Sequence, residues 1–162
     1  MAENFIPQSH RENNEKLVSD GYVHLFEIKL RNGEYLYFKE NNTVEWQGKT
    51  WTGLPLAFEG YSSASGESLS RPTLSIANLE GSFSPFIRDG ILLRSTITRY
   101  SVLYQDILND RNIYQKKVWV AWNVPQLTRD MLQLELRNPM DGVNFDVPAR
   151  MYLPPEFPSV TL

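Results

Sequence analysis

The sequence predicts an all-β domain, mainly antiparallel and barrel-like, from three observations. Apolar and polar residues alternate with the period of half-buried strands, as at residues 26–30 and 132–137. Turn signals such as Asn32-Gly33 and Gln47-Gly48 separate these stretches. Pro72 opens another of them and excludes a helix there, because proline pushes the preceding Arg71 towards an extended backbone. Several short strands with regular turns are typical of a barrel or sandwich.

The strands follow in order from residue 21. Aromatic and aliphatic residues at 22–30 return through the Asn32-Gly33 hairpin into 35–38, and Gln47-Gly48 joins the next two strands. Residues 60–70 hold two glycines and five serines, which indicates a flexible loop. Further strands are predicted at 73–77, 96–104, 118–124 and 132–137, with a polar connection at 106–117.

The predicted domain therefore spans residues 21–153 and has a flanking segment at each end. Residues 1–20 form a polar arm with a short helix at 10–18, since Ser9 and Glu12 have the spacing of a capping box. Residues 154–162 contain three prolines, so this C-terminal tail is expected to be extended and unable to pair as a central strand. It ends in Val160 and Leu162, so the tail is expected either to lie across another subunit or to be a disordered end.

Composition excludes several functional classes. The net charge of -3 and the absence of any basic run longer than Lys116-Lys117 argue against a dedicated nucleic-acid binder. The chain has no cysteine, which excludes disulfides, thiolate zinc ligands and thiol catalysis. The N-terminus lacks the features of a signal peptide, and no apolar stretch is long enough for a membrane span. We therefore expect a soluble product without membrane insertion.

Few residues suggest chemistry. The two histidines, His10 and His24, fit no Ser/His nucleophile system, because no serine lies in a Gly-x-Ser-x-Gly turn. The carboxylate pairs closest in sequence are Asp106 with Asp110 and Asp141 with Asp146, and Asp141-Gly142 is more simply a turn. No metal-ligand spacing or phosphate-binding glycine loop is present. The prediction is a protein that is not an enzyme and has no cofactor and no metal.

Three motifs in a fixed order carry a resemblance that covers residues 17–153. They are the hairpin Val44-Glu45-Trp46-Gln47-Gly48-Lys49-Thr50-Trp51, the stretch Arg71-Pro72-Thr73-Leu74-Ser75-Ile76-Ala77-Asn78-Leu79-Glu80-Gly81, and Asp141-Gly142 followed by Pro148-Ala149-Arg150. In this order the chain resembles the phage minor tail protein L family, the lambda-type tail tip or baseplate hub proteins of long-tailed phages. Longer members continue into a cysteine-rich segment thought to hold an iron–sulfur cluster. This cysteine-free sequence is similar to a short form, so no cluster is carried over.

The resemblance implies a structural component of the distal tail tip in the virion, assembled in the host cytoplasm. Such a protein forms a closed ring that joins the tail tube to the central receptor-binding fibre protein, and it takes part in tail assembly and DNA passage. Its implied partners are further copies of itself, the distal tail or tube-joining ring protein and the central fibre protein, with DNA only in transit. The family implies three-fold symmetry, and the composition alone permits a hexamer.

Five residues are candidates for the subunit interface. Arg71 and Arg150 match the family motif, and arginine pairs bidentately with carboxylates at subunit contacts. Phe157, Val160 and Leu162 are the apolar side chains of the Pro-rich tail. The alternative interpretation of both arginines is a surface ion pair worth roughly 0 to 1 kcal/mol.

Two other functions are consistent with the sequence. A carbohydrate-binding β-sandwich for host-surface recognition would use Trp46, Trp51, Trp119 and Trp122 as stacking platforms, and these would then lie coplanar on an open face. A cell-wall hydrolase would use a carboxylate pair, and zymography would detect it. A tail tip domain would instead bury its tryptophans.

Overall fold

The computed structural model describes residues 6–16, 21–60 and 71–139. Its elements in chain order are α1 (Gln8–Glu15), β1 (Tyr22–Lys29), β2 (Tyr35–Glu40), β3 (Val44–Trp46), β4 (Lys49–Leu54), β5 (Leu56–Glu59), β6 (Thr73–Ala77), the 3-10 turn η1 (Leu79–Gly81), α2 (Ser84–Arg88), β7 (Thr96–Leu103), α3 (Tyr104–Leu108), β8 (Gln115–Leu127) and β9 (Met131–Arg137). The predicted all-β class is confirmed.

The nine strands form one sheet in the order β3-β4-β2-β1-β7-β8-β9-β6-β5. Neighbours are antiparallel except β2 and β4, which pair in parallel. The sheet is strongly bent and does not close into a barrel, since β3 and β5 end the strand order in the described part of the chain. The expected barrel-like curvature is therefore realised in an open sheet.

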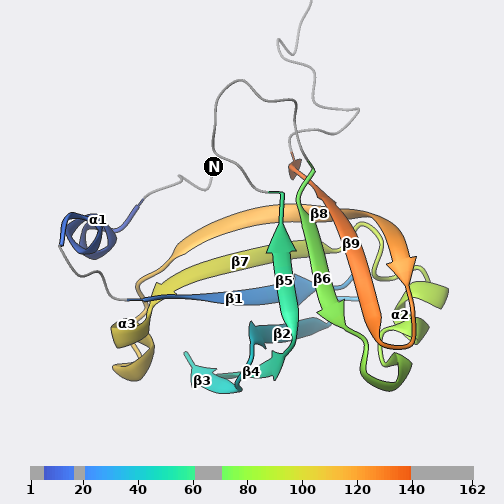
Figure 1. Ribbon diagram of the computed structural model, residues 1–162, viewed down its shortest axis with the longest axis horizontal. Coiled ribbons are helices and arrows are strands. Elements are labelled where there is room, and N and C mark those ends of the chain that lie inside the picture. The colour runs from blue at the N-terminus through green and yellow to red at the C-terminus, as the bar shows by residue number, and fades with distance from the viewer. Residues whose placement is uncertain (1–5, 17–20, 61–70, 140–162) are drawn as a thin grey trace, which may run out of the picture.

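The bend divides the sheet into two layers that cross steeply. In Figure 1, β1, β7 and most of β8 run across the view, whereas β5, β6 and β9 run nearly at right angles over them. The 13-residue β8 carries the corner, because its register with β9 shifts between Ala121 and Asn123 and again between Asn123 and Gln126. Bulges of this kind bend a strand and let one sheet turn back over itself.

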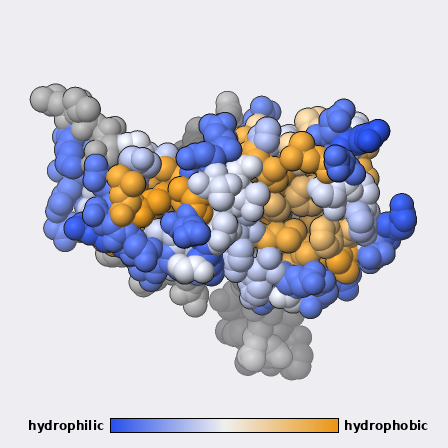
Figure 2. Space-filling model, turned by 90° about the horizontal axis from the view of Figure 1, so that it is seen from below, coloured by the Kyte–Doolittle hydropathy of each residue, from blue (hydrophilic) through white to orange (hydrophobic). Residues whose placement is uncertain are grey.

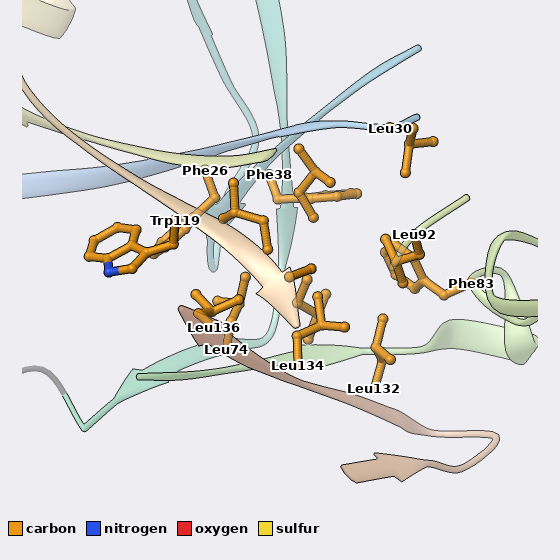
Figure 3. Close-up of a cluster of buried hydrophobic side chains, with 14 residues drawn as sticks. Phe26, Leu30, Phe38, Leu74, Phe83, Leu92, Trp119, Leu132, Leu134 and Leu136 are labelled. Atoms are coloured by element: carbon orange, nitrogen blue, oxygen red, sulfur yellow. The ribbon is translucent and has the colours of Figure 1, made fainter. Parts of the chain in front are cut away.

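The main core fills the space between the two layers. Phe26 and Phe38 enter it from β1 and β2, while Leu74 and Leu134 enter it from β6 and β9 (Figure 3). Phe58 of β5 packs against this core, and the centroid of its ring lies 5.8 Å from that of Phe26 and 5.1 Å from that of Trp119. Burial of these side chains is the main favourable term for the fold, at roughly 25 cal/mol per Å² of apolar surface.

A second, smaller core lies on the other face of β1 and β7. Leu25 and Val102 point away from the main core and pack with Ile107 of α3. The β3–β4 hairpin supplies Trp46 and Trp51, which cover this face. Both faces of the central strands are thus buried, and therefore the segment 22–30 is more continuously apolar than a simple alternation.

The N-terminal helix is present with different bounds. The prediction placed it at 10–18 with Ser9 as its cap, whereas α1 begins at Gln8 and ends at Glu15. The cap position is Pro7, and no side chain caps the helix. Pro7 has the non-helical ψ of 147° that an N-cap residue adopts, and its carbonyl accepts the first hydrogen bonds of the helix. The capping-box interpretation was therefore wrong, and residues 17 and 18 lie outside the described residues.

Candidate interaction site

Arg71 is the predicted interface residue that the structure describes. Its Nη1 lies 2.6 Å from Oε1 of Glu135, so the pair joins the entry of β6 to β9. The Arg71 side chain is 52% exposed and that of Glu135 is 19% exposed. This ion pair leaves part of the arginine fork open to solvent. The other four candidates, Arg150, Phe157, Val160 and Leu162, lie outside the described residues.

The β3–β4 hairpin is held firmly against the turn after α3. The backbone N–H of Gln47 donates to Oδ1 of Asp110 at 2.8 Å, and its side-chain Nε2 donates to the Asp110 carbonyl at 2.7 Å. The indole N–H of Trp46 donates to the carbonyl of Arg111 at 3.1 Å. The predicted turn at Gln47-Gly48 is confirmed, and both residues have positive φ. These contacts position β3, one end of the sheet.

A carboxylate lies beneath the hairpin. Glu27 of β1 accepts from Nζ of Lys49 at 3.1 Å and from the hydroxyl of Tyr100 at 3.3 Å. Burial, and secondly the charge of Glu27, raise the pKa of the Tyr100 phenol well above its ordinary value. Lys49 also lies over the ring of Tyr37, 4.8 Å from its centroid. Glu27 therefore links the β3–β4 hairpin to β1 and β7, which is a structural role.

The β5 end of the sheet is built differently, because a groove lies beside it. The groove has a volume of about 410 Å³ and is mainly apolar. Its lining includes Pro55, Leu56, Ala57, Ser75, Ala77 and Met131. The ends of β5, β6 and β9 that frame it are the lower ones in Figure 1. Viewed from below, apolar side chains gather in two areas separated by polar ones (Figure 2).

The structure brings one Ser/His pair together that the sequence did not indicate. Nδ1 of His24 lies 3.1 Å from Oγ of Ser101, its cross-strand partner on β7. Burial, and secondly the positive charge of Arg99, lower the pKa of His24. Within the described residues no carboxylate is hydrogen-bonded to His24, so the third group of a nucleophilic triad is missing. The pair is a cross-strand contact.

The carboxylate pair Asp106 and Asp110 has structural partners. Asp106 is buried, with Oδ1 3.9 Å from Nη1 of Arg111, and Asp110 holds the hairpin described above. Asp141 and Asp146 lie outside the described residues. Residues 6–16, 21–60 and 71–139 contain no group of three or more His, Cys, Asp or Glu side chains that could hold a metal ion.

The tryptophans do not form a sugar-binding platform. Trp46, Trp51 and Trp119 are 4%, 1% and 5% exposed. Trp122 is 42% exposed, and the guanidinium of Arg137 lies over its ring at 3.6 Å. Three tryptophans are thus core residues, which is the arrangement expected of a tail tip domain and not of a carbohydrate-binding face.

The open, bent β-sheet buries most of its aromatic residues, and in the described part of the chain its end strands leave edges with which other chains can pair. The model of the family described as "Phage minor tail protein L" matches residues 28–155, and the chain belongs to this family. The predicted family is therefore confirmed. No curated protein matches the chain.

A solved structure has the same fold. It is a chain of the "Virion of native gene transfer agent (GTA) particle", with a TM-score of 0.55 and 16% sequence identity. The match covers 91% of this chain and 50% of that one, so the chain spans half the length of the structure that it matches.

The family defines the protein at a coarse level. It is a member of a family of phage minor tail proteins, which are structural components of the virion. Membership of a structural family agrees with the prediction that the chain is not an enzyme. In the described part of the chain, no helix is long and apolar enough to cross a membrane.

Proposed function

We propose that the chain is a component of the distal tail tip, or baseplate hub, of a long-tailed phage. There it forms a closed ring that joins the tail tube to the central receptor-binding fibre protein. The observation that carries this proposal is the open sheet, whose two end strands β3 and β5 have no second neighbour in the described residues. Exposed strand edges invite pairing with other chains, and a structural protein must cover them.

A ring follows from this geometry. The β3 and β5 ends of the sheet differ in sequence and surroundings, so a contact that joins them between subunits is head-to-tail, and such contacts close into a ring when the rotation permits. The family resemblance supports three-fold symmetry, and a hexamer satisfies the same closure. The proposed interface includes Arg71, Arg150, Phe157, Val160 and Leu162, and the half-exposed side chain of Arg71 supports its part in it.

The position in the tail also sets the remaining partners. The ring contacts the distal tail or tube-joining ring protein on one side and the central fibre protein on the other. DNA passes through its lumen during ejection. The net charge of -3 supports this passage, because clustered cations on the inner wall would bind phosphates.

Antibody labelling of intact particles and purified tails, viewed by electron microscopy, tests the location. We expect the label at the distal end of the tail. Particles that carry the protein with an inserted epitope at the exposed Asn109 serve as a second, independent label. Label on the tail shaft or on side fibres, or on no particle, would overturn the proposal.

A further inference from the structure

Exposed apolar side chains gather at the two ends of the molecule. Figure 1 places α1 and α3 at one end of the longest axis and the turn between β8 and β9 at the other. Of the eight large hydrophobic side chains that are exposed in the described residues, six belong to these two ends. They are Ile6, Tyr22, Tyr104 and Leu108 at the first end and Leu79 and Leu127 at the second. Clusters of this kind mark interaction surfaces, whereas single exposed apolar residues are common.

The second end presents its two leucines on a rigid support. Asn78 is fully buried, and its Nδ2 donates to the carbonyl of Thr128 at 2.7 Å while its Oδ1 accepts from the backbone N–H of Phe83 at 2.9 Å. These bonds fix η1 against the β8–β9 turn, so Leu79 and Leu127 lie on neighbouring segments. Both leucines are exposed, Leu79 to 59%. We call this pair the turn surface.

The backbone that carries Leu79 is held in a costly conformation. Glu80 has a φ of 55° although it is not glycine, and Gly81 follows with a φ of 75°. A non-glycine residue with positive φ persists only where the surrounding structure holds it, as the Asn78 hydrogen bonds do here. Leu79 is therefore fixed in one exposed position, so a contact with another chain costs little ordering entropy.

The opposite end presents a second apolar surface on α3. Tyr104 and Leu108 are four residues apart and lie on one face of the helix. Both are exposed, Leu108 to 61%, whereas Asp106 and Ile107 between them are buried and hold the helix in place. Asn109 follows about 100° further round the helix and lies off this face. We call Tyr104 and Leu108 the α3 surface.

The charges beside the two surfaces are complementary. Next to the turn surface, the exposed Glu80 and Asp130 outnumber Arg129. Next to the α3 surface, Asp110 already accepts hydrogen bonds from the β3–β4 hairpin, which leaves the exposed Arg111 as the charge that faces solvent. Opposite charges across a contact set its register and disfavour wrong partners. An acidic turn surface therefore fits the basic side of α3.

A second copy of the chain fits as the partner of both surfaces. The two surfaces lie at opposite ends of one molecule, so they meet only between molecules. Each also borders an end of the sheet. The indole of Trp46 on β3 donates to the carbonyl of Arg111 beside the α3 surface, while Asp130 and Met131 beside the turn surface line the groove next to β5. Contact between the surfaces is thus continuous with the joining of the β3 and β5 ends.

We propose that the turn surface of one copy packs on the α3 surface of the next, with the acidic residues of the turn beside Arg111. The proposal rests on the proposed ring, for which it names the contact between successive subunits. Each copy gives one surface and accepts the other, so the contact is head-to-tail and repeats around the ring.

Disulfide trapping in assembled tails tests this contact, because the chain has no cysteine. Leu79→Cys and Leu108→Cys are made as separate variants, without the inserted epitope, and are produced together so that single tails contain both. Tails are purified, oxidised and run on a non-reducing gel. The matched control combines Leu79→Cys with Tyr35→Cys, whose thiol is also exposed but lies on β2. Leu127→Cys with Tyr104→Cys is the second pair, should a cysteine at position 79 disturb the turn.

We expect a covalent dimer from the mixed Leu79→Cys and Leu108→Cys tails, at least tenfold more abundant than from the control and absent from each variant alone. A dimer from either variant alone would indicate a two-fold contact and overturn the head-to-tail proposal. A dimer yield equal to the control for both pairs would overturn it as well.

The antibody label is a separate observation, because it reports location and not contact. A distal label without dimers overturns this contact and leaves the tail tip location standing. Dimers with a label elsewhere leave the contact standing and overturn the location.

Discussion

At the scale of single residues, replacing Arg71, which pairs with Glu135, distinguishes its contribution to stability from its contribution to assembly. Because the Arg71 side chain is half exposed, we expect Arg71→Ala to change the free energy of unfolding by less than about 1 kcal/mol. If Arg71 lies in the subunit interface, the same change reduces the yield of complete tails several-fold. Urea unfolding and particle counts measure the two effects, with Arg31→Ala, another exposed arginine, as the control. Normal tail yield would remove Arg71 from the interface.

A buried imidazole gives α1 a dependence on pH. His10 is 1% exposed, its two ring nitrogens have no hydrogen-bond partner among the described residues, and its ring packs edge-on against Tyr22. Burial lowers the pKa of His10, and the charge of Asp106 opposes this shift only in part. The docked helix thus favours neutral imidazole. Its stabilisation is present above the ordinary pKa of 6.5 and is lost as the pH falls through the lowered value.

Hydrogen exchange of residues 8–15 between pH 7.5 and 5 tests this linkage. We expect protection of α1 to decrease towards pH 5 by more than intrinsic exchange rates explain. His10→Phe keeps a ring against Tyr22 and removes the titration, so its protection should not depend on pH in this range. The same acid-induced loss in both proteins would assign the effect to carboxylates instead.

At the scale of elements, the β3–β4 hairpin depends on a side chain from a distant turn. Asp110→Ala removes the acceptor of the Gln47 backbone N–H, and we expect a loss of about 1–2 kcal/mol in the free energy of unfolding. The tryptophan emission should shift to the red, because Trp46 and Trp51 lose their cover. Asn109→Ala, which removes one exposed hydrogen bond, is the matched control. An unchanged spectrum would show that the remaining hydrogen bonds and the aromatic packing hold the hairpin without the Asp110 carboxylate.

At the scale of the whole molecule, one ring joins the two layers of the sheet. Phe58 of β5 contacts Phe26 and Trp119 across the core, so Phe58→Ala opens the bend at its free end. We expect a loss of about 2–4 kcal/mol, since Phe58 is partly buried and full burial gives about 3–5 kcal/mol. Phe58→Leu should recover most of it. A loss below about 1 kcal/mol in chemical unfolding would mean that the rest of the main core holds the two layers together without the Phe58 ring.

Local signals predicted most of the elements, and contacts between distant residues accounted for what was missed. The strands around residues 22–30, 73–77 and 132–137 followed from alternation, because each has a face buried in the main core. The parallel pairing of β2 with β4 has no local signal. It depends on a close approach at Gly53, where a Cβ atom would lie 2.4 Å from the Asn41 carbonyl oxygen.

The candidate site was likewise predicted only in part from the sequence. Arg71 was found through a motif, while its partner Glu135 lies 64 residues away and was not foreseen. The contact of Asp110 with Gln47 was also missed, although Asn109-Asp110 is a turn signal that places a carboxylate at a loop tip. Short-range chemistry is readable from residue order, whereas partners depend on which elements the fold brings together.

The central place of β1 also sets the order in which the protein can fold as it is made. β1 lies between β2 and β7, and its pairing with β7 joins Tyr22 to Leu103. At about 5–20 residues per second, the ribosome needs about 4–16 s to make the roughly 80 residues between them. A β1–β2 hairpin forms in about 1–10 μs, so it waits through that whole interval with Phe26 and Ile28 uncovered on one face and Leu25 uncovered on the other. Nascent chains are thus exposed to aggregation until β7 emerges, and slower growth with a co-produced chaperone should raise the soluble yield.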